Sequence, residues 1–170
     1  MFLDESGFRL GSPPNYGWAP VGEKSVGRAT CGAWCTMTML GAIALDGWRG
    51  FATIDAATDG DVFLAFVEQQ LVPRLRRGDI VVMDNLNAHK GTKVLAAIRA
   101  VGADVLFLPP YSPEYNPIES AWAKLKDILR RAHTLTRDAF DAAVAFAMRA
   151  IDHDDIRAWA AHAGYAIGSM

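Results

Sequence analysis

Cysteine is scarce in this chain, because Cys31 and Cys35 are its only two among 170 residues. Two cysteines are too few for the disulfide framework that holds small secreted proteins together. A structural zinc site needs a second pair of ligands at a matching spacing, and the sequence places none beside these two. The scarcity disfavours both kinds of cross-link and predicts a protein of a reducing compartment, the cytoplasm.

Long apolar runs are missing as well. No stretch of the sequence approaches the ~18 consecutive apolar residues that a membrane-spanning helix needs. The first residues also lack the basic segment and apolar core of a secretory signal. We therefore expect no contact with a membrane.

Neither sign of charge is in excess. The chain has 17 Lys and Arg against 19 Asp and Glu, for a formal net charge of -2. This balance disfavours a general polycation that binds nucleic acid through its overall charge. Any affinity for nucleic acid must come from local basic patches and bound cations.

Internal repeats, low-complexity tracts and linkers are absent from the sequence. With 51% hydrophobic residues, a chain of this length buries roughly 70% of its unfolded surface when it folds. We therefore predict one domain over residues 1–170.

The first third of the chain has the pattern of β-strands. Met1–Asp4 is a short apolar strand candidate, and the Gly- and Pro-rich stretch Gly7–Gly27 predicts a long loop or irregular hairpin. Thr30–Leu45 and Trp48–Ile54 are apolar segments separated by the turn dipeptide Asp46-Gly47, which predicts a β-hairpin.

From Thr58 onwards helices and strands alternate. Apolar residues at helical spacing predict a helix from Thr58 that Pro73 kinks or ends, and a second helix around Val94–Val101 that Gly102 closes. Two short apolar runs, Ile80–Met83 and Val105–Leu108, predict buried strands.

The last third of the sequence predicts helices. Asn116 and Pro117 fit the N-cap and first position of a helix that runs to about Arg131. Further helices are expected after an N-cap at Thr136 and from Asp154. The whole order predicts an α/β fold with parallel neighbouring strands, in which ligands gather outside the carboxyl ends of the strands.

Three carboxylates fall where such a fold would place a site. Asp4 ends the first apolar run, Asp84 follows the strand Ile80–Met83, and Glu119 lies in the first turn of a helix. Residues 85 through 118, which are 34 residues, separate Asp84 from Glu119. Convergent carboxylates are the ligands that Mg²⁺ and Mn²⁺ prefer, and two such ions can drive phosphodiester chemistry. The three acids therefore predict a site for Mg²⁺ or Mn²⁺, with two ions.

Several motifs around these acids carry a family resemblance. They are Leu3–Ser6, Val82–Asn85, His89 five positions after Asp84, and Leu108–Glu114 continuing to Asn116–Glu119. Together they resemble the catalytic domain of DDE-superfamily transposases, in particular the mariner-related bacterial insertion-sequence branch. The resemblance spans nearly the whole chain and implies a ribonuclease-H-like fold, with a mixed five-stranded sheet flanked by helices.

The resemblance also implies an activity and partners. Metal-activated water would cut DNA at the ends of the element, and the freed 3′-hydroxyl would attack target DNA. Asp4, Asp84 and Glu119 carry over as metal ligands. Relatives usually have helix-turn-helix modules ahead of this domain, whereas here the first acid is the fourth residue. We therefore expect these modules to be absent, and either a homo-oligomer or a partner chain that supplies them.

Four further residues are candidates for supporting roles. Asn85 and His89 could orient a metal ligand or contact DNA, and either could equally be an ordinary turn or capping residue. Lys126 and Arg130 fall seven and eleven positions after Glu119, on the same stripe of the predicted helix. This stripe could bind the DNA backbone, although Lys and Arg on a helix often form only a solvated face.

Simpler interpretations of the acids also exist. Asp84 could be only a turn residue, and Glu119 could be only the partner of Asn116 in a capping box. At the level of function, the alternatives are an inactive remnant that binds DNA or pairs with a complete transposase, and another ribonuclease-H-like nuclease that acts on RNA hybrids or junctions.

Overall fold

The computed structural model describes residues 1–26, 36–86 and 88–167. Its centre is a five-stranded sheet in the order β3-β2-β1-β4-β5. Strands β1, β2 and β3 are antiparallel neighbours, whereas β4 and β5 run parallel to β1. The strands are β1 (Phe2–Arg9), β2 (Thr36–Ala44), β3 (Gly47–Ile54), β4 (Ile80–Met83) and β5 (Asp104–Phe107). The prediction of a mixed five-stranded sheet is thus confirmed.

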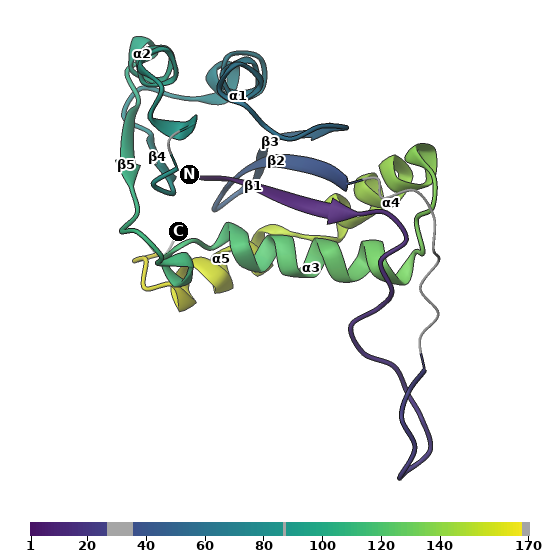
Figure 1. Ribbon diagram of the computed structural model, residues 1–170. Helices are drawn as coiled ribbons and strands as arrows, with labels where there is room; N and C mark the ends of the chain where they lie inside the picture. Colours follow the sequence, from purple (N-terminus) through teal and green to yellow (C-terminus); the bar gives the residue numbers. More distant parts are fainter. Residues whose placement is uncertain (27–35, 87, 168–170) are drawn as a thin grey trace.

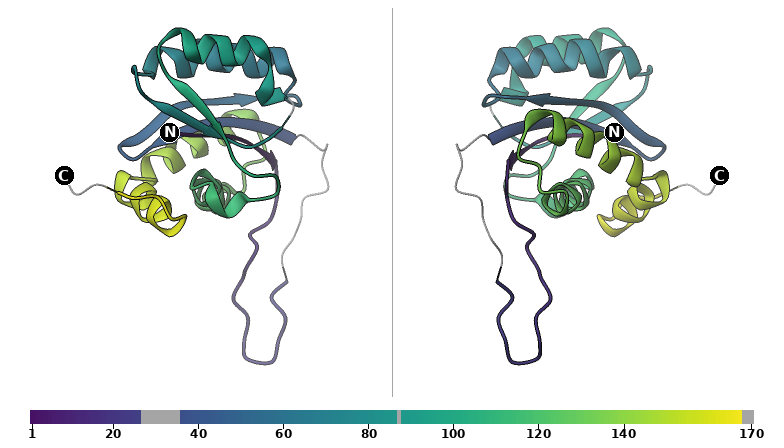
Figure 2. Two further views of the ribbon diagram at one scale, coloured as in Figure 1. Left: turned by 90° about the vertical axis from the view of Figure 1, so that its left-hand side faces the viewer. Right: turned by 90° about the vertical axis from the view of Figure 1, so that its right-hand side faces the viewer.

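Helices cover both faces of this sheet (Figure 1, Figure 2). One face carries α1, which continues through the π-helix η1 into the 3-10 turn η2, and also α2. The other face carries α3, α4 and α5. The bounds are α1 (Gly60–Phe66), η1 (Val67–Leu71), η2 (Val72–Arg74), α2 (Thr92–Ala100), α3 (Ile118–Arg131), α4 (Arg137–Ala150) and α5 (His153–His162), with short 3-10 turns η3 (Ala88–Lys90) and η4 (Pro113–Tyr115).

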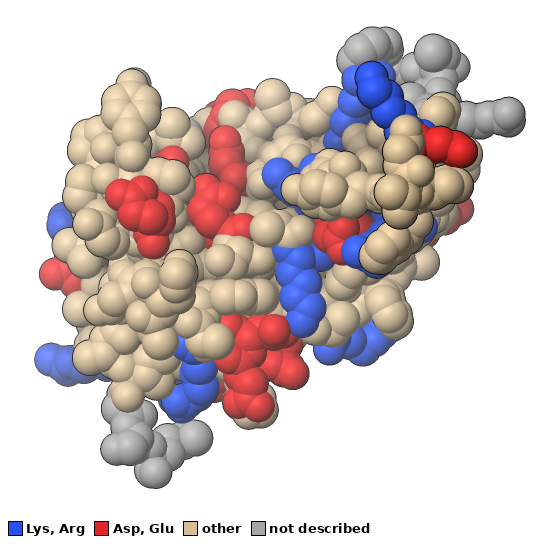
Figure 3. Space-filling view, turned by 90° about the horizontal axis from the view of Figure 1, so that it is seen from below, with Lys and Arg blue, Asp and Glu red and all other residues tan. Residues whose placement is uncertain are grey.

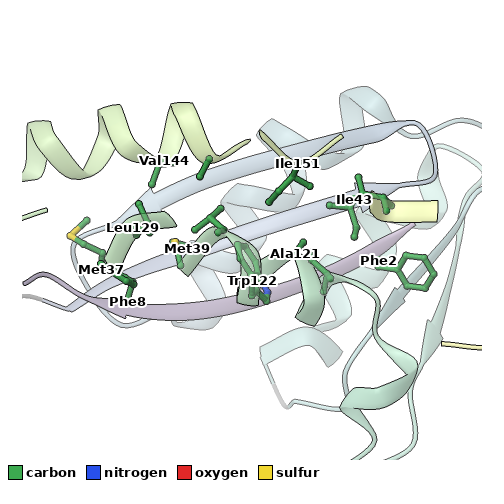
Figure 4. Close-up of a cluster of buried hydrophobic side chains, with 14 of the residues drawn as sticks. Phe2, Phe8, Met37, Met39, Ile43, Ala121, Trp122, Leu129, Val144 and Ile151 are labelled. Carbon is green, nitrogen blue, oxygen red and sulfur yellow. The ribbon is translucent and has the colours of Figure 1, made fainter. Parts of the chain in front are cut away.

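Two apolar clusters fill the space between the sheet and these layers. Strand alternation sends Leu3 toward α1 and α2, and Phe2 and Phe8 toward the other layer. The larger cluster centres on Trp122 of α3, which is 1% exposed and lies over the sheet (Figure 4). Helix α3 is therefore fixed against the sheet through its apolar face.

Three of the five described α-helices, α1, α4 and α5, begin at a side-chain cap. Thr136 accepts the backbone N–H of Ala139 at 3.3 Å, as the sequence predicts, and Asp152 forms a capping box with Asp155. The first helix is capped by Asp59, whose Oδ1 accepts two backbone N–H groups, so the helix begins at Gly60, two residues after the predicted start at Thr58.

The predicted cap of α3 is wrong. The Asn116 side chain makes no capping hydrogen bond, and its Oδ1 is buried without a partner among the described residues. Instead, the Asn116 carbonyl oxygen accepts the N–H of Glu119 at 3.0 Å, and Pro117 already has helical backbone angles. The backbone alone starts this helix, so Glu119 has no capping box to complete.

Strand β1 is longer than the sequence predicts. It continues past Asp4 to Arg9 because its whole length pairs with β2, from Phe2 opposite Ile43 to Arg9 opposite Thr36. Asp4 therefore lies within the strand and not at its end. Gly7 does not start a loop either, because it is paired with Thr38 in the ladder.

The segment after β1 extends away from the rest of the molecule (Figure 2). We call residues 10–26 the arm. Its side chains include Tyr16, Trp18 and Val21, which are almost fully exposed. Cys31, Cys35 and the start of the predicted strand Thr30–Leu45 lie outside the described residues, as does Asn87. No helix in the described part of the chain is long and apolar enough to cross a membrane.

Candidate active site

The sheet places Asp4 and Asp84 side by side. Leu3 of β1 is paired with Met83, the last residue of β4, so each acid follows one member of this pair. Since β4 ends here while β1 continues, the edge beside Asp4 is open. Alternation puts Asp4 on the face that α3 covers.

The chain then brings Glu119 to the same corner. Phe107 of β5 lies opposite Met83, and Leu108 donates its N–H to the Met83 carbonyl oxygen at 2.9 Å. The loop after Leu108 crosses the end of the sheet and leads into α3, whose first turn contains Glu119. As a result Asp4, Asp84 and Glu119 line one cleft, together with Asn85 and the loop residues Pro109–Pro113.

Asp4 is the most buried of the three acids, at 6% exposure. Its Oδ2 accepts a 3.2 Å hydrogen bond from Trp122 Nε1. Burial, followed by the negative charges of Glu119 and Asp84, raises the pKa of Asp4 to about 7. The indole fits here because Gly41, the partner of Asp4 on β2, has no side chain: a Cβ there would lie 2.6 Å from Trp122.

Asp84 is more open, with 37% of its side chain exposed. Its Oδ1 accepts the N–H of Leu86 at 3.1 Å and lies 2.5 Å from Nδ1 of His89. Burial raises the pKa of Asp84, but the contact with His89 and the hydrogen bond from Leu86 outweigh it, so the pKa lies below its usual value. Two acids with opposite pKa shifts therefore share the cleft.

His89 contacts Asp84 from the interior of the protein. Its side chain is completely buried, and its ring stacks on Phe63 of α1 with the centroids 4.3 Å apart. Its Nε2 has no hydrogen-bond partner within the described chain. In this position His89 reaches the cleft only through Asp84.

The predicted basic stripe lies along α3 beyond Glu119. Lys126 is partly buried, and its pKa lies below the usual value mainly because of this burial. The positive charge of Arg130 also lowers this pKa, whereas the negative charges of Glu119 and Asp4 raise it without offsetting the effect of burial. Lys126 is therefore electrostatically coupled to the acids. The neighbouring cations have other partners, because Lys124 binds Asp155 at 2.5 Å and Arg131 binds Asp127 at 2.8 Å.

Acidic and basic side chains alternate over the face formed by α3, α4 and α5 (Figure 3). No broad basic patch is visible on the part of that face that the structure describes. Any affinity of this face for a polyanion depends on a few cations and on metal ions bound by the acids.

The acids fit a hard divalent cation. In the described ranges no three His, Cys, Asp or Glu side chains are already gathered as a metal-binding group. However, Asp4, Asp84 and Glu119 line one cleft, and their mutual repulsion contributes to the raised pKa of Asp4. A divalent cation would relieve this repulsion, and carboxylates are its preferred ligands.

The cleft also includes Tyr111 and Asn116, which the sequence did not indicate as site residues. Tyr111 is fully exposed at its rim and has a φ of 57°, in the left-handed region that a bulky residue rarely adopts. In the sequence, Tyr111 follows Pro109-Pro110 and precedes Ser112-Pro113, and this pattern was the available indication of an unusual loop. Asn116 lines the cleft as well, and its buried, unpaired Oδ1 could not be read from the sequence.

Comparison with family models identifies the family of the chain. The family model described as DDE superfamily endonuclease matches residues 1–141, which include all three acids. The chain belongs to the DDE superfamily of endonucleases. The match ends within α4, so α5 lies beyond it. No curated protein sequence matches the chain.

Solved structures share the fold of this DDE endonuclease domain. The Mos1 strand transfer complex has a TM-score of 0.72 at 14% identity, covering 98% of this chain and 55% of that one. The Mos1 mariner paired end complex with Mn has a TM-score of 0.73 at 13% identity, covering 95% and 52%. The isolated catalytic domain of Mos1 mariner transposase has a TM-score of 0.64 at 11% identity, covering 98% and 83%. The chain thus has the fold of that catalytic domain and spans about half of the longer Mos1 chains.

Proposed function

We propose that this DDE endonuclease domain is the catalytic domain of a transposase of the mariner-related insertion-sequence branch. In this proposal it cuts DNA at the ends of an element and joins the freed 3′-hydroxyl to target DNA. The observation that carries the proposal is the cleft lined by Asp4, Asp84 and Glu119, which come from β1, the end of β4 and the first turn of α3. These three residues would hold Mg²⁺ or Mn²⁺, as two ions.

The bound ions would activate the attacking oxygen and stabilise the leaving oxygen of the phosphodiester. The side chains around the acids would prepare the site. Trp122 fixes one oxygen of Asp4 through its indole N–H, and His89 fixes Asp84. Both acids are thereby oriented before metal or substrate arrives.

DNA is the proposed partner. The structures with the same fold are named as a strand transfer complex, paired end complexes and a complex with the left transposon end. The proposed contacts to the phosphate backbone are Lys126 and Arg130, on the stripe of α3 that leads away from Glu119. Asn85 lines the cleft and is a further proposed contact to DNA. Recognition of the element ends would come from helix-turn-helix modules outside residues 1–170 or in a partner chain. We propose a homo-oligomer that acts in the cytoplasm.

The experiment is cleavage and joining with defined oligonucleotides. Wild-type protein and the Asp84→Asn variant are incubated with Mn²⁺ and a DNA duplex, or with an RNA:DNA hybrid of the same sequence. A second duplex with a free 3′-hydroxyl is offered together with a plasmid. We expect wild type alone to cut the DNA duplex and to join the 3′-hydroxyl to the plasmid.

Other outcomes would contradict the proposal. Preference for the hybrid would identify another ribonuclease-H-like nuclease. Binding of DNA by both proteins with cleavage by neither would identify a DNA-binding remnant.

A further inference from the structure

A second cleft lies directly beside the carboxylate cleft, on the other side of Glu119. It is formed by η4 and the start of α3 on one side and the end of α5 on the other. Its volume is about 420 Å³, which lies within the range of small-ligand sites. Its lining includes Asn116, Glu119, Ala123 and Trp159.

The two clefts share a wall. Both clefts are lined by Pro113, Asn116 and Glu119. A DNA strand with one phosphate at the three acids would therefore have the adjoining nucleoside within reach of the second cleft. Asn116 in this wall is 4% exposed and keeps an unpaired Oδ1 among the residues described. The wall between the two clefts therefore contains a hydrogen-bond acceptor that has no partner among the described residues.

Hydrogen bonds connect the two walls of the second cleft. Lys124 of α3 binds Asp155 of α5 at 2.5 Å, and the Tyr165 hydroxyl donates to the Tyr115 carbonyl oxygen at 2.8 Å. Trp159 packs partly against the core cluster of this layer, and another part of it lines the cleft. The indole is thus a fixed aromatic surface inside a preformed hollow.

We propose that this second cleft binds an unstacked nucleoside of the DNA strand whose neighbouring phosphate lies at the three acids. This proposal rests on the proposed function. Trp159 provides the stacking surface for the base, as aromatic side chains do for single-stranded nucleic acid. The acids Glu114 and Glu119 at the cleft disfavour a phosphate inside it, so the base and sugar enter and the phosphates stay outside. Residues of α5, beyond the matched family region, thereby position the substrate.

The test compares binding of intact and abasic oligonucleotides. Dissociation constants are measured by fluorescence anisotropy for a single strand of about 12 nucleotides and for a series with one abasic position each, at low salt in Ca²⁺. Wild type, Trp159→Ala and Ala123→Phe are compared. Ala123 lies on the exposed side of α3, so Phe at this position fills the cleft without a change in the core.

For wild type we expect one abasic position to weaken binding about tenfold, the effect of losing one base–aromatic stack. Both variants should bind the intact strand about tenfold more weakly and show no further loss at that position. Trp18→Ala, which removes an exposed tryptophan from the arm, should behave as wild type.

An unchanged abasic profile in both variants would overturn the proposal, as would a wild-type profile without any sensitive position. The binding measurement needs no cleavage. Failure of the nucleoside site is therefore distinct from failure of the proposed activity, which is tested by the loss of cleavage in Asp84→Asn.

Discussion

At the scale of single residues, Asp4 and Asp84 are two carboxylates in opposite environments. Asp4 is buried among negative charges and its pKa is raised to about 7, whereas His89 and a backbone N–H lower the pKa of Asp84. Such a divergence of pKa values is typical of functional sites. It also has a measurable consequence for stability.

We predict that Asp4→Asn stabilises the metal-free protein, and more so at high pH. The folded state binds the Asp4 proton more tightly than the unfolded state, whose pKa is near 3.8. The free energy of unfolding of wild type therefore falls as pH rises from about 4 to 7 and is level above that. Asn keeps the acceptor for Trp122 but cannot ionise. Urea unfolding in EDTA should show an advantage of the variant that is about 1 to 4 kcal/mol larger at pH 8 than at pH 4.

An advantage of equal size at both pH values would contradict this account of Asp4. Glu5→Gln, one position along β1 and on the opposite face of the sheet, is the matched control, and this substitution should leave the pH dependence of stability unchanged.

His89 is the second residue whose role can be tested. His89→Phe should keep the stack on Phe63 and lose the contact with Asp84. Because that contact lowers the pKa of Asp84, its loss should move the acidic limb of the pH–rate profile to higher pH and lower activity by about 10- to 100-fold. His89→Asn, which can retain a nitrogen near Nδ1, should recover part of the activity. A lowered rate with an unshifted profile would mean that His89 acts only in packing.

At the scale of elements, the site depends on where strands end. The sequence was sufficient to predict β4, the following Asp84, and the helix that contains Glu119, because short apolar runs and Pro117 are local signals. It could not predict that β1 continues past Asp4, since that length is set by pairing with a distant strand, β2. The convergence of the acids likewise depends on the pairing of Leu3 with Met83. The missing cap at Asn116 could not be predicted either, because it depends on the burial of that side chain in the wall of the cleft.

The contact between β2 and α3 yields a prediction for one glycine. Gly41→Ala would place a methyl group 2.6 Å from Trp122, so the indole must move away from Asp4. We expect a destabilisation of about 1–3 kcal/mol in chemical denaturation, and a loss of cleavage activity. Gly60→Ala is the control, because a Cβ there meets nothing within 4 Å, and it should be neutral or slightly stabilising. Equal stability of the two variants would contradict the packing described for Trp122.

At the scale of the whole molecule, the protein lacks the overall positive charge of many DNA-binding proteins. Its net charge is -2, and charges of both signs alternate on the face beneath the sheet (Figure 3). Binding of DNA must then depend on a small number of placed cations and on metal ions at the acids. This dependence can be measured from the change of DNA affinity with salt concentration.

We predict that Lys126→Gln and Arg130→Gln each reduce the slope of log affinity against log salt by about 1, because each removes one phosphate contact. Arg99→Gln is the control, since Arg99 lies on α2 in the opposite layer, 3.6 Å from Asp104. Its slope should equal that of wild type. If all three substitutions had the same effect, the stripe on α3 would not be the DNA contact.

The most direct test of the three-carboxylate site is nicking of supercoiled plasmid at low salt with Mn²⁺, for wild type beside Asp84→Asn. Circular dichroism and thermal unfolding should first show that both proteins are folded. We predict that wild type nicks the plasmid, that EDTA stops it, and that the variant is inactive. Nicking by a folded Asp84→Asn variant at the wild-type rate would contradict the assignment of Asp4, Asp84 and Glu119 as the catalytic metal ligands.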